Sequence, residues 1–132
     1  MTRLLLDTHI WLWSFLAPGH LSARVVNALK NPGHELWLSP ISIWELVMLK
    51  EKGRVSLEKS VEEWVEEGMK KAGLREAPLT AAVALETIGV RLPHGDPADR
   101  FLVATARVFD LTLVTADKRL LATKNVSLLP NR

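Results

Sequence analysis

The sequence predicts an α/β domain with a mostly parallel central sheet, because two kinds of segment alternate along its 132 residues. Short apolar runs of strand length, such as Leu4-Leu5-Leu6, are separated by longer segments with helical periodicity. Several of these runs are apolar at consecutive positions, which is typical of strands buried on both faces of a parallel sheet. Five strands are expected, at residues 3–6, 35–38, 74–77, 112–115 and 127–129.

Seven helices are expected around this sheet, and several have recognisable ends. Ser39 followed by Pro40 predicts a capped helix start with proline in the first turn. Ser60 and Glu63 form a capping box, and Gly73 is a natural helix stop. The expected helices cover residues 10–16, 22–31, 40–52, 61–72, 80–86, 97–109 and 118–122.

The composition favours one domain over residues 1–132, since 48% of the residues are hydrophobic and no segment resembles a linker. The chain has no cysteine, which excludes disulfides, thiolate zinc sites and cysteine nucleophiles. The apolar run at residues 4–6 is too short for a signal peptide, and no stretch is long enough to span a bilayer. We therefore expect a cytoplasmic protein without a membrane partner.

Two acidic residues come directly after predicted strands. Asp7 follows the first strand, and Asp117 lies just beyond the strand that ends at Thr115. In open parallel sheets, ligands bind outside the carboxyl ends of the strands, so both carboxylates are expected near one edge of the sheet. Thr115 could add a hydroxyl to the same site. The alternative for each aspartate is a structural role as the N-cap of the following helix.

Two further acidic residues lie on predicted helices. Glu45 interrupts an apolar run, where burial of an unpaired carboxylate is costly, so it either pairs with a base, faces a polar cleft or lies on a solvated helix edge. Asp99 lies in the first turn of the helix that Asp96 and Pro97 begin. Asp96 has a sufficient structural role as the N-cap, and Asp99 has the alternative role of complementing the helix dipole.

Together, Asp7, Glu45, Asp99 and Asp117 are expected to converge at one edge of the sheet. Such a cluster is tolerated when cations neutralise it or when some of the acids are protonated. Ligands that are all oxygen favour Mg²⁺ or Mn²⁺ over softer metals. His9 and His94 flank the site in sequence, and either could bond a phosphate or a carboxylate, with a structural role as the alternative.

Basic and aromatic residues near the acidic motifs are candidates for contacts with a phosphate backbone. The net charge of +2 does not by itself indicate a nucleic-acid binder, but it allows one if the acids gather in a site and the bases surround it. The candidate basic rim consists of Lys50, Lys52, Arg54, Arg100, Arg107, Lys118 and Arg119. The spacing of the five tryptophans beside Leu and Ile favours the core or a subunit interface, and only Trp11 or Trp13 could instead serve for base stacking.

Four segments resemble, in order, the motifs of the PIN-domain family and, within it, of the VapC-type toxins. They are residues 4–9 with Asp7, residues 39–46 with Glu45, residues 94–106 with Asp99 and its companion Asp96, and residues 113–117 with Thr115 and Asp117. No acidic position departs from the family pattern. The resemblance implies a PIN-like three-layer sandwich of four to five strands and about seven helices, usually dimeric, that cleaves RNA with Mg²⁺ or Mn²⁺.

The resemblance also implies a protein partner. A VapB-like antitoxin would wrap its C-terminal segment along the helices at roughly residues 40–72 and block the acidic site. A homodimer or a larger toxin–antitoxin assembly is expected. Around the four acids, Thr8, His94, Asp96 and Thr115 are the expected supporting residues, and Lys50, Arg100, Lys118 and Arg119 are the candidate RNA contacts.

The expected reaction is hydrolysis of an RNA phosphodiester by a metal-activated water. Asp7, Asp99 and Asp117 would hold one cation, and Glu45 would bind a second ion or orient the water. The main alternative is a non-catalytic member of the same fold that binds RNA or protein. An aspartyl-phosphate phosphohydrolase is disfavoured because His9 stands where that chemistry uses a second aspartate, and a DNA nuclease is disfavoured because such enzymes are normally larger.

Overall fold

The computed structural model describes residues 2–132 and has a five-stranded sheet at its centre. The strands are β1 (Arg3–Leu6), β2 (Glu35–Leu38), β3 (Leu74–Glu76), β4 (Thr112–Thr115) and β5 (Ser127–Pro130). Their order is β3-β2-β1-β4-β5, and all four neighbouring pairs are parallel. The predicted strands are confirmed to within one residue, and the described sheet is wholly parallel.

Seven α-helices surround the sheet, as expected from the sequence. They are α1 (Thr8–Leu16), α2 (Ala23–Lys30), α3 (Pro40–Glu51), α4 (Val61–Ala72), α5 (Ala81–Glu86), α6 (Pro97–Phe109) and α7 (Lys118–Leu121). The structure adds two short 3₁₀ turns, η1 (Pro18–His20) and η2 (Thr87–Gly89), that the sequence did not predict. Helix α1 begins two residues earlier than predicted, because Asp7 is its N-cap.

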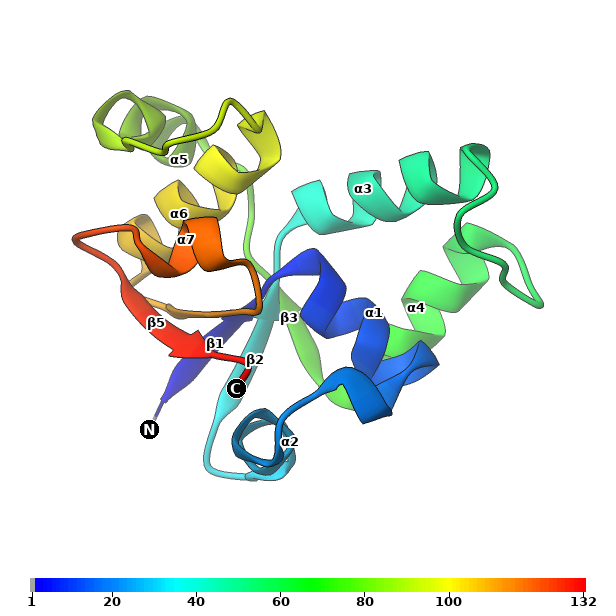
Figure 1. The fold of residues 1–132 in the computed structure, drawn as a ribbon. Coiled ribbons are helices and arrows are strands. Elements are labelled where there is room, and N and C mark those ends of the chain that lie inside the picture. The colour runs from blue at the N-terminus through cyan, green and yellow to red at the C-terminus, as the bar shows by residue number, and fades with distance from the viewer. Residues whose placement is uncertain (1) are drawn as a thin grey trace.

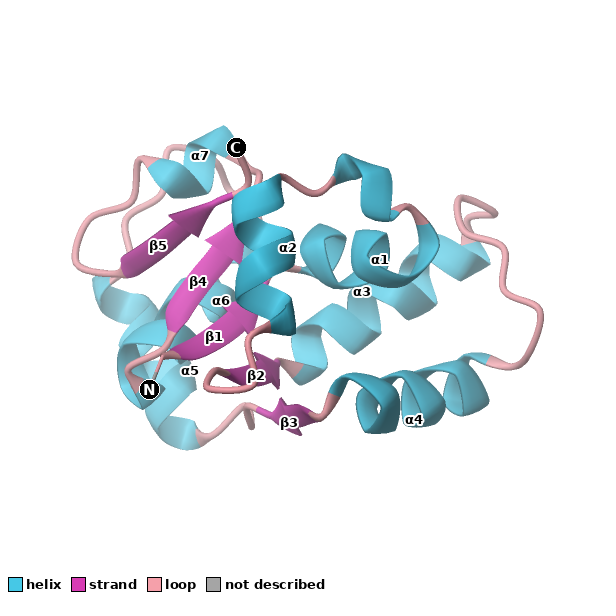
Figure 2. Cartoon of the chain, turned by 90° about the horizontal axis from the view of Figure 1, so that it is seen from below, coloured by secondary structure: helices cyan, strands magenta, loops and turns pink. Residues whose placement is uncertain are grey.

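The helices cover the two faces of the sheet as separate layers (Figures 1 and 2). Alternate residues of β1 point to opposite faces, so Leu5 packs with residues of α5, α6 and α7, whereas Leu4 and Leu6 pack with residues of α1 to α4. Strand β4 repeats the pattern with Leu113 and Val114. The predicted three-layer sandwich is therefore confirmed. No helix within residues 2–132 is long and apolar enough to cross a membrane.

The strand order places the start of α1 at the switch point of the sheet. From β1 the chain moves outward through β2 to β3, and it returns to the other side of β1 as β4. At such a point the connections leave the sheet in opposite directions and open a crevice at the carboxyl ends of the strands. The backbone N–H of Asp7 still donates to the carbonyl of Val114, at 3.0 Å, so the ends of β1 and β4 stay locked together.

Candidate active site

Asp7 ends β1 and is buried at the edge of the sheet, with 7% of its surface exposed. Its Oδ1 accepts from the backbone N–H of Thr8, and its Oδ2 accepts from the hydroxyl of Thr115, each at 2.7 Å. The capping role that the sequence offered is confirmed, and it leaves Asp7 at the edge where the site is expected. One oxygen begins α1, and the other is held by the neighbouring strand.

Thr115 connects Asp7 with Asp117. Its hydroxyl donates to Asp7 and accepts from the backbone N–H of Asp117, at 3.0 Å. Asp117 in turn caps α7, and its carboxylate pairs with the guanidinium of Arg119, at 2.9 Å between Nη2 and Oδ2. Thr115 is thus more than a strand residue, because it ties together two of the predicted carboxylate positions.

Glu45 lies on α3 and is half-buried beside the start of α1. Its Oε1 accepts from the hydroxyl of Thr8. The buried hydroxyl oxygen of Ser42 lies 2.8 Å from that of Thr8. A hydroxyl has one proton, so when Thr8 donates to Glu45, Ser42 must be the donor to Thr8. Ser42 was missed from the sequence, although a serine three residues before Glu45 in an apolar helix was the available signal.

Asp99 lies in the first turn of α6 and is 6% exposed. Its Oδ2 is 2.6 Å from Nε2 of His94, which confirms that His94 bonds a carboxylate. Within residues 2–132, Nδ1 of His94 is buried without a partner, so the imidazole is anchored by Asp99 alone. Asp96 caps α6 by accepting from the N–H of Ala98, at 3.0 Å, as the sequence predicts.

The predicted carboxylates line one open hollow of about 290 Å³ at the carboxyl edge of the sheet. Its walls are formed by Asp7, His9, Trp13, Glu45, Asp96, Asp99, Ala116, Asp117 and Arg119. Segments far apart in the sequence thus converge as expected. In residues 2–132, no three carboxylates or imidazoles meet closely enough to hold an ion in their present positions, and each of the four main acids is bonded to a protein group.

The electrostatics of the hollow fit a hard divalent cation. Burial raises the pKa of Asp7, Glu45 and Asp99, and nearby carboxylates raise it further. Only Asp117 departs from this pattern, because its hydrogen bonds and ion pair with Arg119 hold its pKa below the ordinary value. The donors are carboxylate oxygens, which Mg²⁺ and Mn²⁺ prefer. A bound cation would relieve the desolvation and the mutual repulsion together.

Only part of the candidate basic rim lies at the acidic hollow. Arg119 lines the hollow, but Lys118, Arg100 and Lys50 are exposed and do not line it. The guanidinium of Arg100 donates instead to the carbonyl of Thr87, at 2.6 Å.

The tryptophans differ in their surroundings. Trp11 is fully buried and packs edge-on against Trp64, with ring centroids 5.4 Å apart, so the favoured core role is confirmed and base stacking on Trp11 is excluded. Trp13 lines the hollow and stacks on His20, with centroids 5.0 Å apart. Trp44 is 54% exposed, which excludes the core role that its apolar neighbours suggested.

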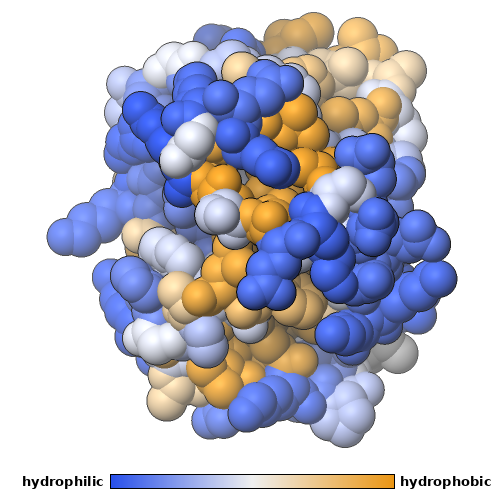
Figure 3. All heavy atoms as spheres, turned by 90° about the vertical axis from the view of Figure 1, so that its right-hand side faces the viewer, coloured by the Kyte–Doolittle hydropathy of each residue, from blue (hydrophilic) through white to orange (hydrophobic). Residues whose placement is uncertain are grey.

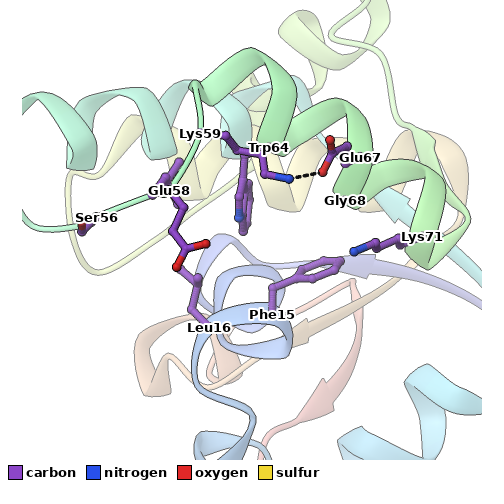
Figure 4. Close-up of a pocket in the computed structure, with 10 residues that line it drawn as sticks. Phe15, Leu16, Ser56, Glu58, Lys59, Trp64, Glu67, Gly68 and Lys71 are labelled. Carbon is purple, nitrogen blue, oxygen red and sulfur yellow. Dashed lines mark hydrogen bonds and ion pairs between the residues drawn. The ribbon is translucent and has the colours of Figure 1, made fainter.

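A second hollow, of about 310 Å³, lies between α1, α4 and the segment that precedes α4. Phe15 and Trp64 point into it, with ring centroids 5.6 Å apart in an edge-to-face arrangement (Figure 4). Lys59 and Glu67 form an ion pair at its margin, and Leu16 is 46% exposed beside it. On this side of the molecule a band of apolar side chains runs between charged ones (Figure 3).

Replacing Asp7 by Asn should raise the free energy of unfolding of the metal-free protein near neutral pH relative to its value at about pH 4, because Asn removes a charge that burial disfavours. Burial raises the pKa of Asp7, so the folded state binds this proton more tightly than the unfolded state does. Stability is therefore lost as pH rises from the unfolded pKa through the folded one, and Asn avoids that loss. Urea unfolding in EDTA should show the gain near pH 7 shrinking towards about pH 4.

Asp110→Asn is the matched control for this measurement. Asp110 is exposed at the end of α6 with φ 54°, a conformation that Asn also tolerates. This variant removes one carboxylate at the opposite edge of the sheet and should show no comparable gain. An Asp7→Asn protein that is destabilised equally at both pH values would contradict the charge-burial argument.

Comparison with known proteins identifies the family of this chain. The profile of the PIN domain matches residues 4–126. Ribonuclease VapC22 of Mycobacterium tuberculosis (strain ATCC 25618 / H37Rv) is 37% identical over 123 residues, which cover 91% of each chain.

Solved structures of low identity share the fold. VapBC2 from Rickettsia felis, bound to a DNA fragment from its promoter, matches with a TM-score of 0.74 at 17% identity and covers 98% of each chain. FitAcB from Neisseria gonorrhoeae matches with a TM-score of 0.62 at 23% identity and covers 97% of each chain. The profile match and the sequence relative both span nearly the whole chain, so this protein belongs to the PIN domain family, among its VapC-type members.

Proposed function

We propose that this protein is a metal-dependent endoribonuclease and the toxin of a toxin–antitoxin pair. The observation that carries the proposal is the convergence of Asp7, Glu45, Asp99 and Asp117 on one open hollow at the switch point of the sheet. The likeness to a VapC ribonuclease, 37% identical over 91% of the chain, supports the same activity. A non-catalytic binding role is disfavoured, because a buried acid cluster is costly to keep and contributes nothing to binding a polyanion without cations.

The residues that would hold a divalent ion are Asp7, Asp99 and Asp117, with Glu45 at a second ion or at the attacking water. When bound, Mg²⁺ or Mn²⁺ supplies a more acidic water and offsets charge on the phosphate oxygens. Asp7 is already fixed for this role by Thr8 and Thr115. A carboxylate has about four lone-pair sites, so Glu45, Asp99 and Asp117 can bind the ion while keeping the protein partners that set their orientation.

Each carboxylate has a neighbour that limits its rotation. His94 holds Asp99 on α6, and Arg119 holds Asp117 at the start of α7. The hydroxyl chain from Ser42 through Thr8 holds Glu45. Groups bonded in this way lose little rotational freedom when substrate binds, which lowers the entropic cost of reaching the reactive arrangement. Nothing in this chemistry uses the 2′-OH, so preference for RNA must come from binding.

The proposed antitoxin site is the second hollow, between α1 and α4. Its edge-to-face pair of Phe15 and Trp64 offers an apolar floor, and charged residues such as Lys71 border it. An apolar centre with a charged margin is the usual anatomy of a protein interface. The hollow lies at the far end of α1 from the carboxylates, so a chain segment that fills it can continue towards the acidic hollow. This supports a VapB-like partner.

A homodimer is part of the same proposal. Leu85 and Ile88 on α5 and η2 are 67% and 71% exposed, and Leu79 beside them is 40% exposed. Large apolar side chains exposed this close together are typical of a surface covered in the assembled protein. This patch lies on the opposite layer from α1 and α4, so a second copy there leaves both hollows open.

The activity is tested by RNA cleavage with the purified protein. Asp7→Asn and Asp99→Asn should each lower the cleavage rate by at least about a hundredfold in Mg²⁺ or Mn²⁺, because each removes a charged oxygen ligand. Substrates should be structured RNAs and total cellular RNA, with EDTA as the metal-free control. Asp110→Asn, which removes a distant carboxylate, should cleave normally. Undiminished cleavage in either site variant would refute that residue's role.

Thr8→Val tests the orientation of Glu45. The substitution removes the hydroxyl and keeps the shape, so Glu45 loses its donor and Ser42 loses its acceptor. We expect cleavage to fall about 10- to 100-fold, as for second-layer partners of metal ligands, and stability to fall by about 1–2 kcal/mol. Thr8→Ser keeps the hydroxyl and should restore most of the rate. Equal rates for the Val and Ser variants would contradict the positioning role.

Leu16→Glu tests the antitoxin site. A charge beside the Phe15–Trp64 pair should weaken inhibition of cleavage by the neighbouring reading frame's protein by at least about tenfold, the size expected for an interface hot spot. Cleavage without the inhibitor should be unchanged, because Leu16 does not line the acidic hollow. Ala23→Glu places the same charge at an exposed position of α2 and should leave inhibition intact. Equal inhibition of both variants would place the partner elsewhere.

A further inference from the structure

Trp44 is the one large apolar side chain of α3 that the fold leaves exposed within residues 2–132, at 54%. It immediately precedes Glu45, yet it points away from the core that Leu46 enters, because Leu46 is fully buried. Exposing a tryptophan forgoes roughly 1.5–3 kcal/mol of burial, the value typical of a large apolar side chain. An apolar ring exposed beside a carboxylate hollow therefore needs an explanation beyond folding.

Trp44 lines a shallow hollow that adjoins the acidic one. This hollow measures about 190 Å³, and its walls include Met48 of α3 and His9 of α1. Glu45 and His9 line both hollows, so the two lie side by side. The volume is below the roughly 300–1,000 Å³ of a site that encloses a whole small molecule. The shape suits a shelf that receives one group of a longer ligand.

The far end of this shelf is basic. Lys52 and Arg54 line it and are exposed, and within residues 2–132 neither forms an ion pair. The acidic end therefore suits cations bound against one phosphate, and the basic end suits phosphates directly. An apolar ring beside the acidic end, with cations further along, matches a strand in which bases alternate with phosphates.

We propose that Trp44, Lys52 and Arg54 form a binding shelf for the single-stranded RNA segment that adjoins the cleaved bond, with one base stacked on Trp44. The inference rests on the proposed ribonuclease function and adds the residues that hold the substrate. Stacking on an aromatic ring accepts any base, since every base has a π-face, and exposed cations neutralise the backbone. The shelf therefore supplies affinity and position and leaves sequence choice to other contacts.

The spacing of residues along α3 sets the length of the shelf. Lys52 lies seven residues beyond Glu45, which is about 10 Å at the helical rise of 1.5 Å per residue. A stacked strand advances about 3.4 Å per nucleotide, so the basic end meets the backbone about three nucleotides from the cleaved phosphate. Trp44 directly precedes Glu45, so its ring stands at the acidic end of this span.

Binding of a fluorescein-labelled, mixed-sequence, single-stranded RNA of about ten nucleotides tests the shelf. All variants carry Asp99→Asn, and fluorescence anisotropy is read in EDTA at low salt, so that cleavage plays no part. Trp44→Ala should weaken binding about 5- to 20-fold, within the range for loss of one stacked base. Trp44→Phe keeps a ring and should stay within about threefold of the parent.

The cations are tested by the salt dependence of the same binding. Lys52→Ala with Arg54→Ala should lower the slope of log affinity against log salt by about 1.4, or about 0.7 for each contact with a single strand. The matched control is Arg24→Ala with Lys30→Ala, which removes two exposed charges from α2, away from both hollows. That control should bind with the parent's slope.

Several results would overturn the shelf. Equal binding by the parent and Trp44→Ala would do so, as would a Trp44→Phe protein no better than Trp44→Ala. A change in molecular mass on gel filtration that accompanies the loss would assign Trp44 to an interface instead. If the wild-type protein cleaves RNA while Trp44→Ala binds normally, the shelf proposal is wrong and the proposed function stands. If the wild-type protein neither binds nor cleaves RNA, the proposed function fails and the shelf with it.

Discussion

The burial of several carboxylates at one edge of the sheet governs the functional end of this molecule. Asp7, Glu45 and Asp99 are partly or wholly removed from water, and burial raises the pKa of each. Such a group of acids would normally disperse to the surface or acquire bases. Here the sheet and the starts of α1 and α6 hold them together, so the fold maintains an unfavourable arrangement that a divalent cation would relieve.

Local capping is the device that makes this arrangement compatible with folding. Asp7, Asp96 and Asp117 each accept from a backbone N–H at the start of a helix. The same amide that needs a cap also favours a nearby negative charge, so each cap offsets part of the cost of burying its carboxylate. Structure and chemistry therefore draw on the same residues, and removing a cap would disturb both.

Most of the fold was predictable, because strand runs and helix ends depend on local sequence. Residues such as Ser39, Ser60 and Gly73 begin or end helices where expected. Features that depend on packing across the sheet were harder to predict from the sequence. Trp11 and Trp44 lie in similar apolar surroundings in sequence, yet one is buried and the other is exposed, since only the direction of each helix face decides the outcome. The link from Ser42 to Thr8 joins residues 34 positions apart, so the sequence alone did not reveal which partner Ser42 bonds.

The two ends of helix α1 serve different tasks. Its first residue, Thr8, orients a carboxylate, and its last residues, Phe15 and Leu16, border the aromatic hollow. A one-residue change in the length of this helix would rotate one end by about 100° relative to the other. Insertions and deletions in α1 are therefore excluded during divergence. New partner specificities must arise by exchanging side chains on a backbone whose length and phase stay constant.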